Sequence, residues 1–156
     1  MFSKTLLFSA LVALAFTTAR AEPPPSAADF DFSQYQGQVV ILDFWASWCP
    51  PCKRSFPWFN EMKKKYGEHG LVIVGVNTDE KWSDAERFLA QIPADFLLLR
   101  DPEGHLKERF EVTGMPTTFI FDLGGDMVAR HLGFQVAKQA EYEAELRQIL
   151  TKVPEQ

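Results

Sequence analysis

Two cysteines, Cys49 and Cys52, are the side chains of this 156-residue sequence whose type and spacing best suit covalent chemistry, and the sequence has no others. Pro50 and Pro51 separate them, directly after an apolar run and at the expected start of a helix. The backbone N–H groups and the positive dipole end of such a helix start favour the thiolate form of Cys49. Because the thiolate is the reactive species, this spacing predicts a dithiol redox site.

A structural disulfide is the simplest alternative interpretation of the same pair. The stabilisation that a disulfide provides grows with the length of the loop that it closes. Cys49 and Cys52 enclose only Pro50 and Pro51, so a bridge between them restrains very little of the unfolded chain. The spacing therefore favours a reactive pair.

The composition is that of one acidic globular domain. Asp and Glu number 21 against 16 Lys and Arg, the formal net charge is −5, and 46 % of the residues are hydrophobic. An acidic balance without a basic run argues against a nucleic-acid partner, and the apolar fraction is normal for a folded protein. This length accommodates one core and is too short for two ordinary domains.

The first 21 residues have the pattern of a secretory signal peptide. Lys4 gives a positive start, residues 6–16 are apolar, and Ala19-Arg20-Ala21 resembles a cleavage site. The apolar stretch is shorter than the roughly 20 residues of a spanning helix, although a retained N-terminal membrane anchor remains the alternative. Export to the periplasm would place both cysteines where disulfides persist.

Hydrophobic periodicity predicts alternating strands and helices after a proline-rich tail over 22–28, which we expect to pack little. Continuous apolar runs at 39–44 and 71–76 are typical of strands covered on both faces. A helix is expected over 51–66, and another over 83–91 with Ser83 as its cap. The remaining pattern predicts strands at 96–99, 117–121 and 127–132, and helices at 104–110 and from 135. This order indicates a one-domain α/β sandwich.

Two segments carry a resemblance to the thioredoxin superfamily. Residues 40–53, around Trp48-Cys49-Pro50-Pro51-Cys52, resemble its active-site region, and Gly114-Met115-Pro116-Thr117 is similar to its cis-proline loop. Residues 79–101 between them resemble the insertion of TlpA/ResA-like exported thiol-disulfide oxidoreductases. The resemblance, which extends over about 30–133, implies a thioredoxin-like three-layer sandwich over 29–156, with a central mixed β-sheet and helices on both faces.

The sequence departs from that family at its buried acid. Several cytochrome-maturation members have Glu where this chain has Ser55, whereas Asp43 stands at the position of the buried aspartate of thioredoxin. Thioredoxin pairs that aspartate with a lysine, and the matching position here is Gly75. We therefore expect Asp43 to lack a cationic neighbour and its pKa to be raised by burial.

The resemblance implies roles for particular residues. Cys49 would attack a substrate disulfide, and Cys52 would resolve the mixed disulfide after losing its proton to Asp43. A polar strand residue satisfied by backbone groups is the alternative for Asp43. A cis Pro116 would leave the preceding backbone free to pair with an extended substrate. The residues expected to contact substrate are Trp48, Pro50, Met115 and Pro116.

These expectations together describe an exported reductase of specific periplasmic protein disulfides, expected to be monomeric and supplied by a membrane electron donor of the thiol-reducing type. No cofactor beyond the Cys49–Cys52 disulfide is expected. Pro50 and Pro51 do not fix the direction of electron flow, so a disulfide-forming oxidant is one alternative. A copper or zinc carrier using both thiolates is another, although His69, His105 and His131 lack metal-ligand spacing and no metal site is expected.

Overall fold

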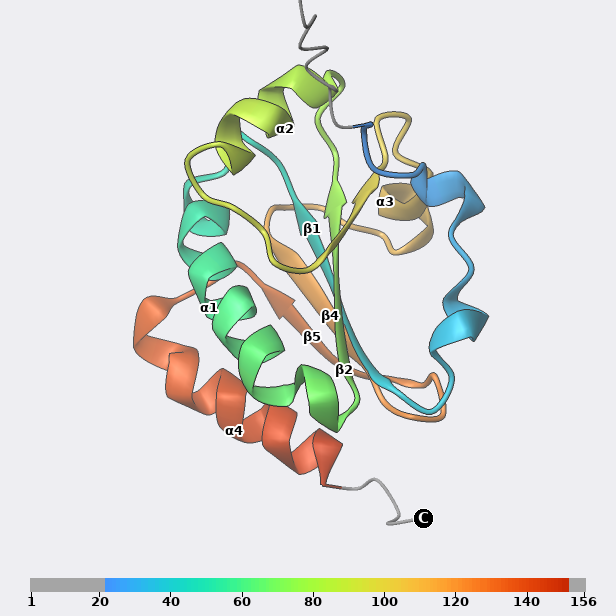
Figure 1. Ribbon diagram of the computed structural model, residues 1–156, viewed down its shortest axis with the longest axis vertical. Coiled ribbons are helices and arrows are strands. Elements are labelled where there is room, and N and C mark those ends of the chain that lie inside the picture. The colour runs from blue at the N-terminus through green and yellow to red at the C-terminus, as the bar shows by residue number, and fades with distance from the viewer. Residues whose placement is uncertain (1–21, 152–156) are drawn as a thin grey trace, which may run out of the picture.

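The computed structural model of the protein describes residues 22–151 (Figure 1). Its centre is a five-stranded sheet in the order β3-β2-β1-β4-β5. The strands are β1 (Val39–Trp45), β2 (Leu71–Asn77), β3 (Leu97–Arg100), β4 (Thr117–Phe121) and β5 (Met127–Leu132). The first three are parallel, whereas β4 runs antiparallel to β1 and β5 antiparallel to β4. The signal peptide expected over 1–21 lies outside the described residues.

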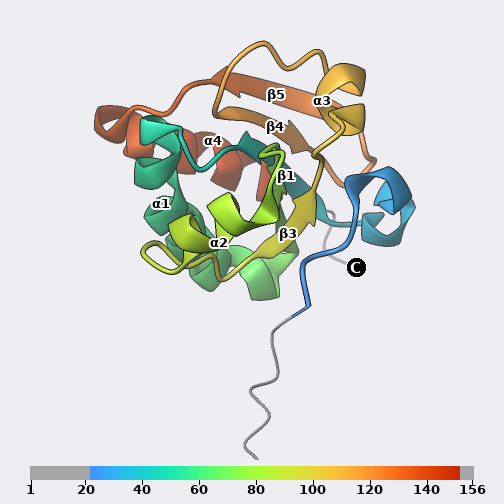
Figure 2. The same cartoon turned by 90° about the horizontal axis from the view of Figure 1, so that it is seen from above.

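Helices cover both faces of the sheet (Figures 1 and 2). One face carries the helices α1 (Pro50–Tyr66), α2 (Trp82–Leu89) and α4 (Gln139–Leu150). The other face carries α3 (His105–Arg109) and the N-terminal 3-10 turns η1 (Ala27–Asp29) and η2 (Phe32–Tyr35). Two further turns, η3 (Gly67–His69) and η4 (Val136–Lys138), lead into β2 and α4. The predicted thioredoxin-like three-layer sandwich with a mixed sheet is confirmed.

The central strand β1 is buried along its whole length. Side chains alternate between the two faces of a strand, so a strand covered on both faces needs apolar residues at nearly every position. Ile41 and Trp45 pack in the cluster below α1, and Leu42 and Phe44 pack in the cluster on the α3 side. Asp43 interrupts this apolar run, and strand alternation puts it on the same face as Ile41 and Trp45.

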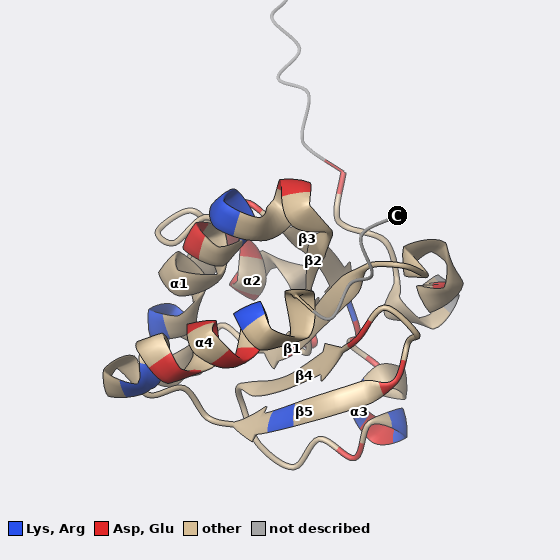
Figure 3. Cartoon of the chain, turned by 90° about the horizontal axis from the view of Figure 1, so that it is seen from below, with Lys and Arg blue, Asp and Glu red and all other residues tan. Residues whose placement is uncertain are grey.

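Helix α1 is tied to α4 through Glu143. The Glu143 carboxylate accepts a hydrogen bond of 2.7 Å from the Tyr66 hydroxyl and lies 3.3 Å from Lys65 Nζ. The hydrogen bond from Tyr66, and then that from Lys65, hold the pKa of Glu143 below its usual value against a smaller raising by burial. Elsewhere on these helices, acidic and basic residues are interspersed (Figure 3). The ties at Glu143 fix the two helices against each other below the sheet.

The start of α2 differs from the sequence prediction. The helix begins at Trp82, Lys81 occupies the cap position, and no side chain caps it, so the cap assigned to Ser83 is wrong. The approach to the helix is fixed upstream instead, where Asp79 N–H donates to Asn77 Oδ1 at 3.2 Å. The path of the chain into α2 is therefore not fixed by a side-chain cap.

The proline-rich segment over 22–28 also packs more than its composition predicts. Arg100 N–H donates to the Pro25 carbonyl at 3.0 Å, and Arg100 Nε donates to the Pro24 carbonyl at 2.8 Å. Ser26 forms a parallel bridge with Arg100, and Ala27 is buried. The segment thus covers the outer edge of β3 before the chain crosses the α3 side of the sheet.

Within residues 22–151, none of the helices combines the length and the apolar character that crossing a membrane requires.

Candidate active site

The two cysteines form a disulfide at the first turn of α1, with an S–S distance of 2.06 Å. Cys49 is the N-cap of the helix, and Cys52 N–H donates to Cys49 Sγ at 3.2 Å. Pro50 and Pro51 fill the intervening positions and have no N–H to donate. The several N–H donors expected around Cys49 are therefore reduced to that of Cys52 within this turn.

The disulfide lies at the rim of the core. Cys52 is fully buried, and Cys49 retains 1 % exposure. Their neighbours are open to solvent, because Pro50 is exposed and the Trp48 side chain is 69 % exposed. A partner molecule that approaches the disulfide therefore meets Trp48 and Pro50 first.

The loop before β4 lies at the same edge of the sheet. Its Met115–Pro116 peptide is cis, as predicted. Phe44 near the end of β1 pairs with Thr117 at the start of β4, so the loop and the Cys49 segment leave the sheet at one end. The Pro116 carbonyl accepts a 2.8 Å hydrogen bond from Gly133 N–H, and half-buried Met115 packs against the core cluster that includes both cysteines.

Asp43 is fully buried in β1, on the sheet face that carries Cys52. Its Oδ1 accepts a 2.6 Å hydrogen bond from Thr118 Oγ1, the residue opposite it in β4, and its Oδ2 has no hydrogen-bond partner among the described residues. Burial raises the pKa of Asp43 to about 8, against a smaller lowering by Thr118. The expected upward shift is present, and the partner is a hydroxyl on the neighbouring strand.

The neighbouring strand also explains why Asp43 has no cation opposite it. Gly75 of β2 pairs with Asp43, as the resemblance implied. A Cβ atom at Gly75 would lie 2.9 Å from a ring carbon of Phe96 and 3.2 Å from Trp45 Nε1. The space that a lysine side chain would need is filled by apolar groups, so the charged form of Asp43 gains no compensation from β2.

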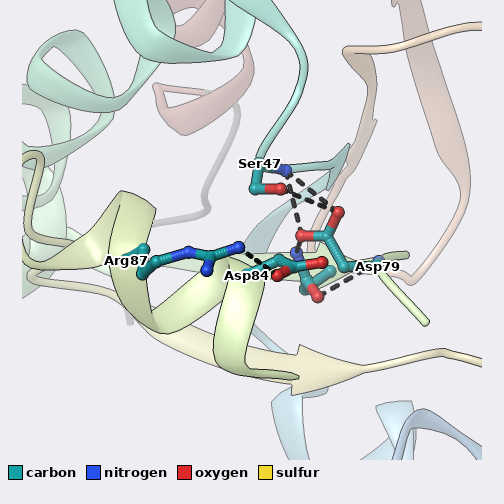
Figure 4. Close-up of polar contacts among 5 residues, drawn as sticks. Ser47, Asp79, Asp84 and Arg87 are labelled. Atoms are coloured by element: carbon teal, nitrogen blue, oxygen red, sulfur yellow. Dashed lines mark hydrogen bonds and ion pairs between the residues drawn. The ribbon is translucent and has the colours of Figure 1, made fainter. Parts of the chain in front are cut away.

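A second buried carboxylate, Asp79, escaped the sequence analysis. It accepts hydrogen bonds from Ser47 N–H at 2.9 Å, Ser47 Oγ at 3.0 Å and Asn77 Nδ2 at 2.8 Å (Figure 4). Ser47 stands two residues before Cys49, so Asp79 ties the active-site loop to the end of β2. The one sequence signal was an acid just beyond an apolar strand, and the Ser47 partner lies 32 residues away.

No group of three or more His, Cys, Asp and Glu side chains is placed to hold a metal ion in the described part of the chain. His131, expected at the surface, is half-buried, and its Nε2 lies 2.7 Å from Glu145 Oε2.

Comparison with known proteins agrees with this architecture. The model of the AhpC/TSA family matches residues 13–130. The thiol-disulfide oxidoreductase ResA of Bacillus thuringiensis is 31 % identical over 111 residues, which are 71 % of this chain and 64 % of the relative. The chain thus spans less than two thirds of the length of such curated relatives.

Two solved structures extend the comparison. A putative thiol:disulfide interchange protein DsbE from Chlorobium tepidum is 43 % identical with a TM-score of 0.76, over 81 % of this chain and 91 % of that chain. The pneumococcal exposed lipoprotein thioredoxin Etrx1, from Streptococcus pneumoniae, is 30 % identical with a TM-score of 0.64, over 74 % and 88 % of the two chains. Since the family match spans most of the sequence, the chain belongs to the AhpC/TSA family, with thioredoxin-like ResA- and DsbE-type thiol-disulfide oxidoreductases among its homologues.

Proposed function

We propose that this protein is an exported thiol-disulfide oxidoreductase that reduces specific protein disulfides through the Cys49 and Cys52 dithiol. The observation that carries the proposal is the Cys49–Cys52 disulfide at the N-terminus of α1, where Cys52 N–H donates to Cys49 Sγ. The same N–H can donate to the Cys49 thiolate of the reduced form, which favours the nucleophilic state. The ResA and DsbE homologues support the same chemistry.

The reaction exchanges one disulfide for another. The Cys49 thiolate attacks a sulfur of the substrate disulfide, breaks that bond, forms a mixed disulfide and releases one substrate thiolate. Cys52 then loses its proton and attacks Cys49 Sγ, which releases the second substrate thiolate. The substrate gains two electrons, and the protein is left with the Cys49–Cys52 disulfide. A thiol-reducing membrane donor restores the dithiol.

Asp43 accepts the proton of Cys52 in this proposal, directly or through water. Its burial on the same sheet face as Cys52 supports this role, as does its Oδ2, which has no hydrogen-bond partner among residues 22–151. The raised pKa of Asp43, about 8, lets this carboxyl group gain and lose a proton near neutral pH, as a general base must. Thr118 holds the other oxygen and so orients the carboxyl group.

Substrate contacts are assigned to the groups that surround Cys49. Trp48 and Pro50 present exposed surface next to it, and the cis Met115–Pro116 loop offers backbone for an extended substrate segment. The protein acts in the periplasm as a monomer, after export by the signal peptide over 1–21. The relative Etrx1, described as an exposed lipoprotein, supports an extracytoplasmic location.

Insulin reduction by the dithiol form tests the proposal, with Cys49→Ser and Cys52→Ser variants compared. Cys49→Ser should abolish turnover, whereas Cys52→Ser should accumulate a mixed disulfide through Cys49 that mass spectrometry detects. The reduction potential against glutathione then fixes the direction, and a value near that of strong oxidants would reverse it. Tight stoichiometric copper binding without disulfide exchange would overturn the proposal.

A further inference from the structure

A groove of about 330 Å³ lies directly beside the active-site segment. Ser47 and Trp48 line it on the side of the Cys49 loop, and Lys53 lines it from α1. Arg87 and Phe88 of α2 line it on the side of the segment over 79–101. The groove therefore connects the surface next to Cys49 with a helix that contributes none of the residues assigned above.

The groove is built on fixed walls. Asp79 holds Ser47 through both its N–H and its hydroxyl (Figure 4), and Thr78 N–H donates to the Trp45 carbonyl at 3.0 Å. Phe88, at 5 % exposure, packs on the Trp45 ring with 4.9 Å between ring centroids. The active-site loop and α2 are thus fastened to each other, and a bound segment would find the groove already formed.

Sheet order places this groove across from the cis-proline loop. The strand order β3-β2-β1-β4-β5 puts the Met115–Pro116 loop on the β4 side of β1. α2 follows β2 and leads to β3, so it lies on the opposite side of β1 (Figure 2). A chain that pairs with the loop and passes Cys49 therefore continues toward α2.

The charges along the groove favour an acidic occupant. Lys53 and Arg87 are both exposed at its edge, although the whole chain carries a net charge of −5. Asp84 is the acidic residue among the groove lining, and it is ion-paired with Arg87. A guanidinium has five N–H donors, so this pair leaves Arg87 able to bind a second acceptor. The local balance is positive beside the apolar surface of Trp48 and Phe88.

We propose that this groove binds the polypeptide segment that flanks the reactive cysteine of the substrate protein, and that it selects segments carrying an acidic residue next to an apolar one. This inference rests on the proposed reduction of protein disulfides and adds the class of sequence that is reduced fastest. The acidic side chain pairs with Lys53 and Arg87, and the apolar side chain lies against Trp48.

Three peptides test it, each with one cysteine in a mixed disulfide with the same chromogenic thiol. They share an apolar residue and differ only in carrying Glu, Gln or Lys on both flanks of the cysteine. We expect kcat/KM to be about three- to fivefold higher for the Glu peptide than for the Gln peptide, the size of exposed ion pairs, and lowest for the Lys peptide. The preference should shrink in high salt.

Variants that remove one positive charge each show which residues cause the preference for the Glu peptide. Lys53→Gln and Arg87→Gln should each bring the Glu and Gln peptides closer to equal kcat/KM, and the double variant should equalise them. Arg54→Gln is the matched control, because Arg54 is an exposed cation next to Lys53 on α1 that does not line the groove. Arg54→Gln should keep the wild-type ratio.

Equal kcat/KM for the three peptides with the wild-type protein would overturn the groove assignment. A Lys53→Gln variant that slows all peptides by one factor would also overturn it, since that result places Lys53 at the thiolate and not at the substrate. Both outcomes leave disulfide reduction intact. Failure to reduce every peptide and insulin would instead overturn the proposed function.

Discussion

Two buried carboxylates, one inside β1 and one just beyond the end of β2, differ in the hydrogen bonds that they accept. Asp79, just beyond the end of β2, accepts hydrogen bonds from two donors of Ser47 and one of Asn77. Asp43, inside β1, accepts one from Thr118, and its second oxygen has no partner among the described residues. Both side chains are less than a tenth exposed, so burial alone does not distinguish them.

The number of hydrogen-bond donors around each carboxylate determines its role. A carboxylate whose oxygens accept several hydrogen bonds acts as a fixed tie between the segments that donate them. A carboxyl group with one donor and apolar neighbours is held near the point where it gains or loses a proton. The difference agrees with a positioning role for Asp79 and with the proposed proton-transfer role for Asp43, and a separate substitution tests each role.

The largest effect should come from pH-dependent stability of the disulfide form. The folded pKa of Asp43, about 8, lies above its unfolded value of roughly 3.9, so folding retains a proton that unfolding releases. This stability is present in full below pH 4 and is lost as pH rises through 8. Asp43→Asn should remove a pH dependence worth up to about 4 kcal/mol at pH 7. Urea unfolding at several pH values measures this dependence. If the unfolding free energy changes with pH in the same way for wild type and Asp43→Asn, the prediction is contradicted.

Removing the other carboxylate should lower the free energy of unfolding. Asp79→Ala leaves the Ser47 and Asn77 donors unsatisfied in a buried site, and we expect the unfolding free energy to fall by about 2 to 4 kcal/mol. Glu80→Ala, at the exposed acid next along the chain, is the matched control and should change it by less than about 0.5 kcal/mol. Chemical denaturation compares the two variants. Equal losses would mean that the hydrogen bonds of Asp79 are not what stabilises the loop.

The rate of resolution sharpens the role of Asp43. Asp43→Asn should slow the attack of Cys52 on a preformed mixed disulfide by about tenfold or more, because no carboxylate then accepts the thiol proton. It should also remove a rise in rate centred near pH 8. Stopped-flow release of the substrate thiol over pH 6 to 9 reports both quantities. An unchanged pH profile would show that Asp43 is not the acceptor.

The smallest expected effect on stability comes from removing a single hydrogen bond, the one from the Ser47 hydroxyl to Asp79. Ser47→Ala removes the hydroxyl donor but keeps the backbone N–H, so we expect a loss of about 1 kcal/mol. In the Asp79→Ala background the same change should cost much less, because its acceptor is already gone. A double-mutant cycle by denaturation measures this coupling. Additive losses would indicate that Ser47 and Asp79 act independently.

Local patterns predicted the strands and the Cys49–Cys52 pairing well. The apolar runs over 39–44 and 71–76 identified β1 and β2, because a strand covered on both faces leaves a continuous signature. The position of Asp43 opposite Gly75 followed from the resemblance and is observed. These features depend on residues close in sequence or on a motif with known spacing.

Contacts between distant segments were harder to predict. Sequence periodicity does not reveal the hydrogen bond from Thr118 to Asp43 or the one from Ser47 to Asp79. Each joins residues that are far apart in the sequence and meet only in the folded chain. The pairing of 24–27 with β3 was missed for a related reason, since proline carbonyls can accept hydrogen bonds even in a segment whose composition is typical of a tail. The sequence shows that a buried polar group needs a hydrogen-bond partner, but it does not show which residue is that partner.

The two prolines between the cysteines bear on which redox form the protein prefers. Pro51 occupies a position whose amide could have donated to the Cys49 sulfur, and the Cys52 amide remains as the donor from this turn. A thiolate with fewer donors is less stabilised, and a couple whose dithiol form is less stable gives up its electrons more readily. The missing amide hydrogen of Pro51 leaves the Cys49 thiolate with one donor fewer, which we expect to make the couple a stronger reductant.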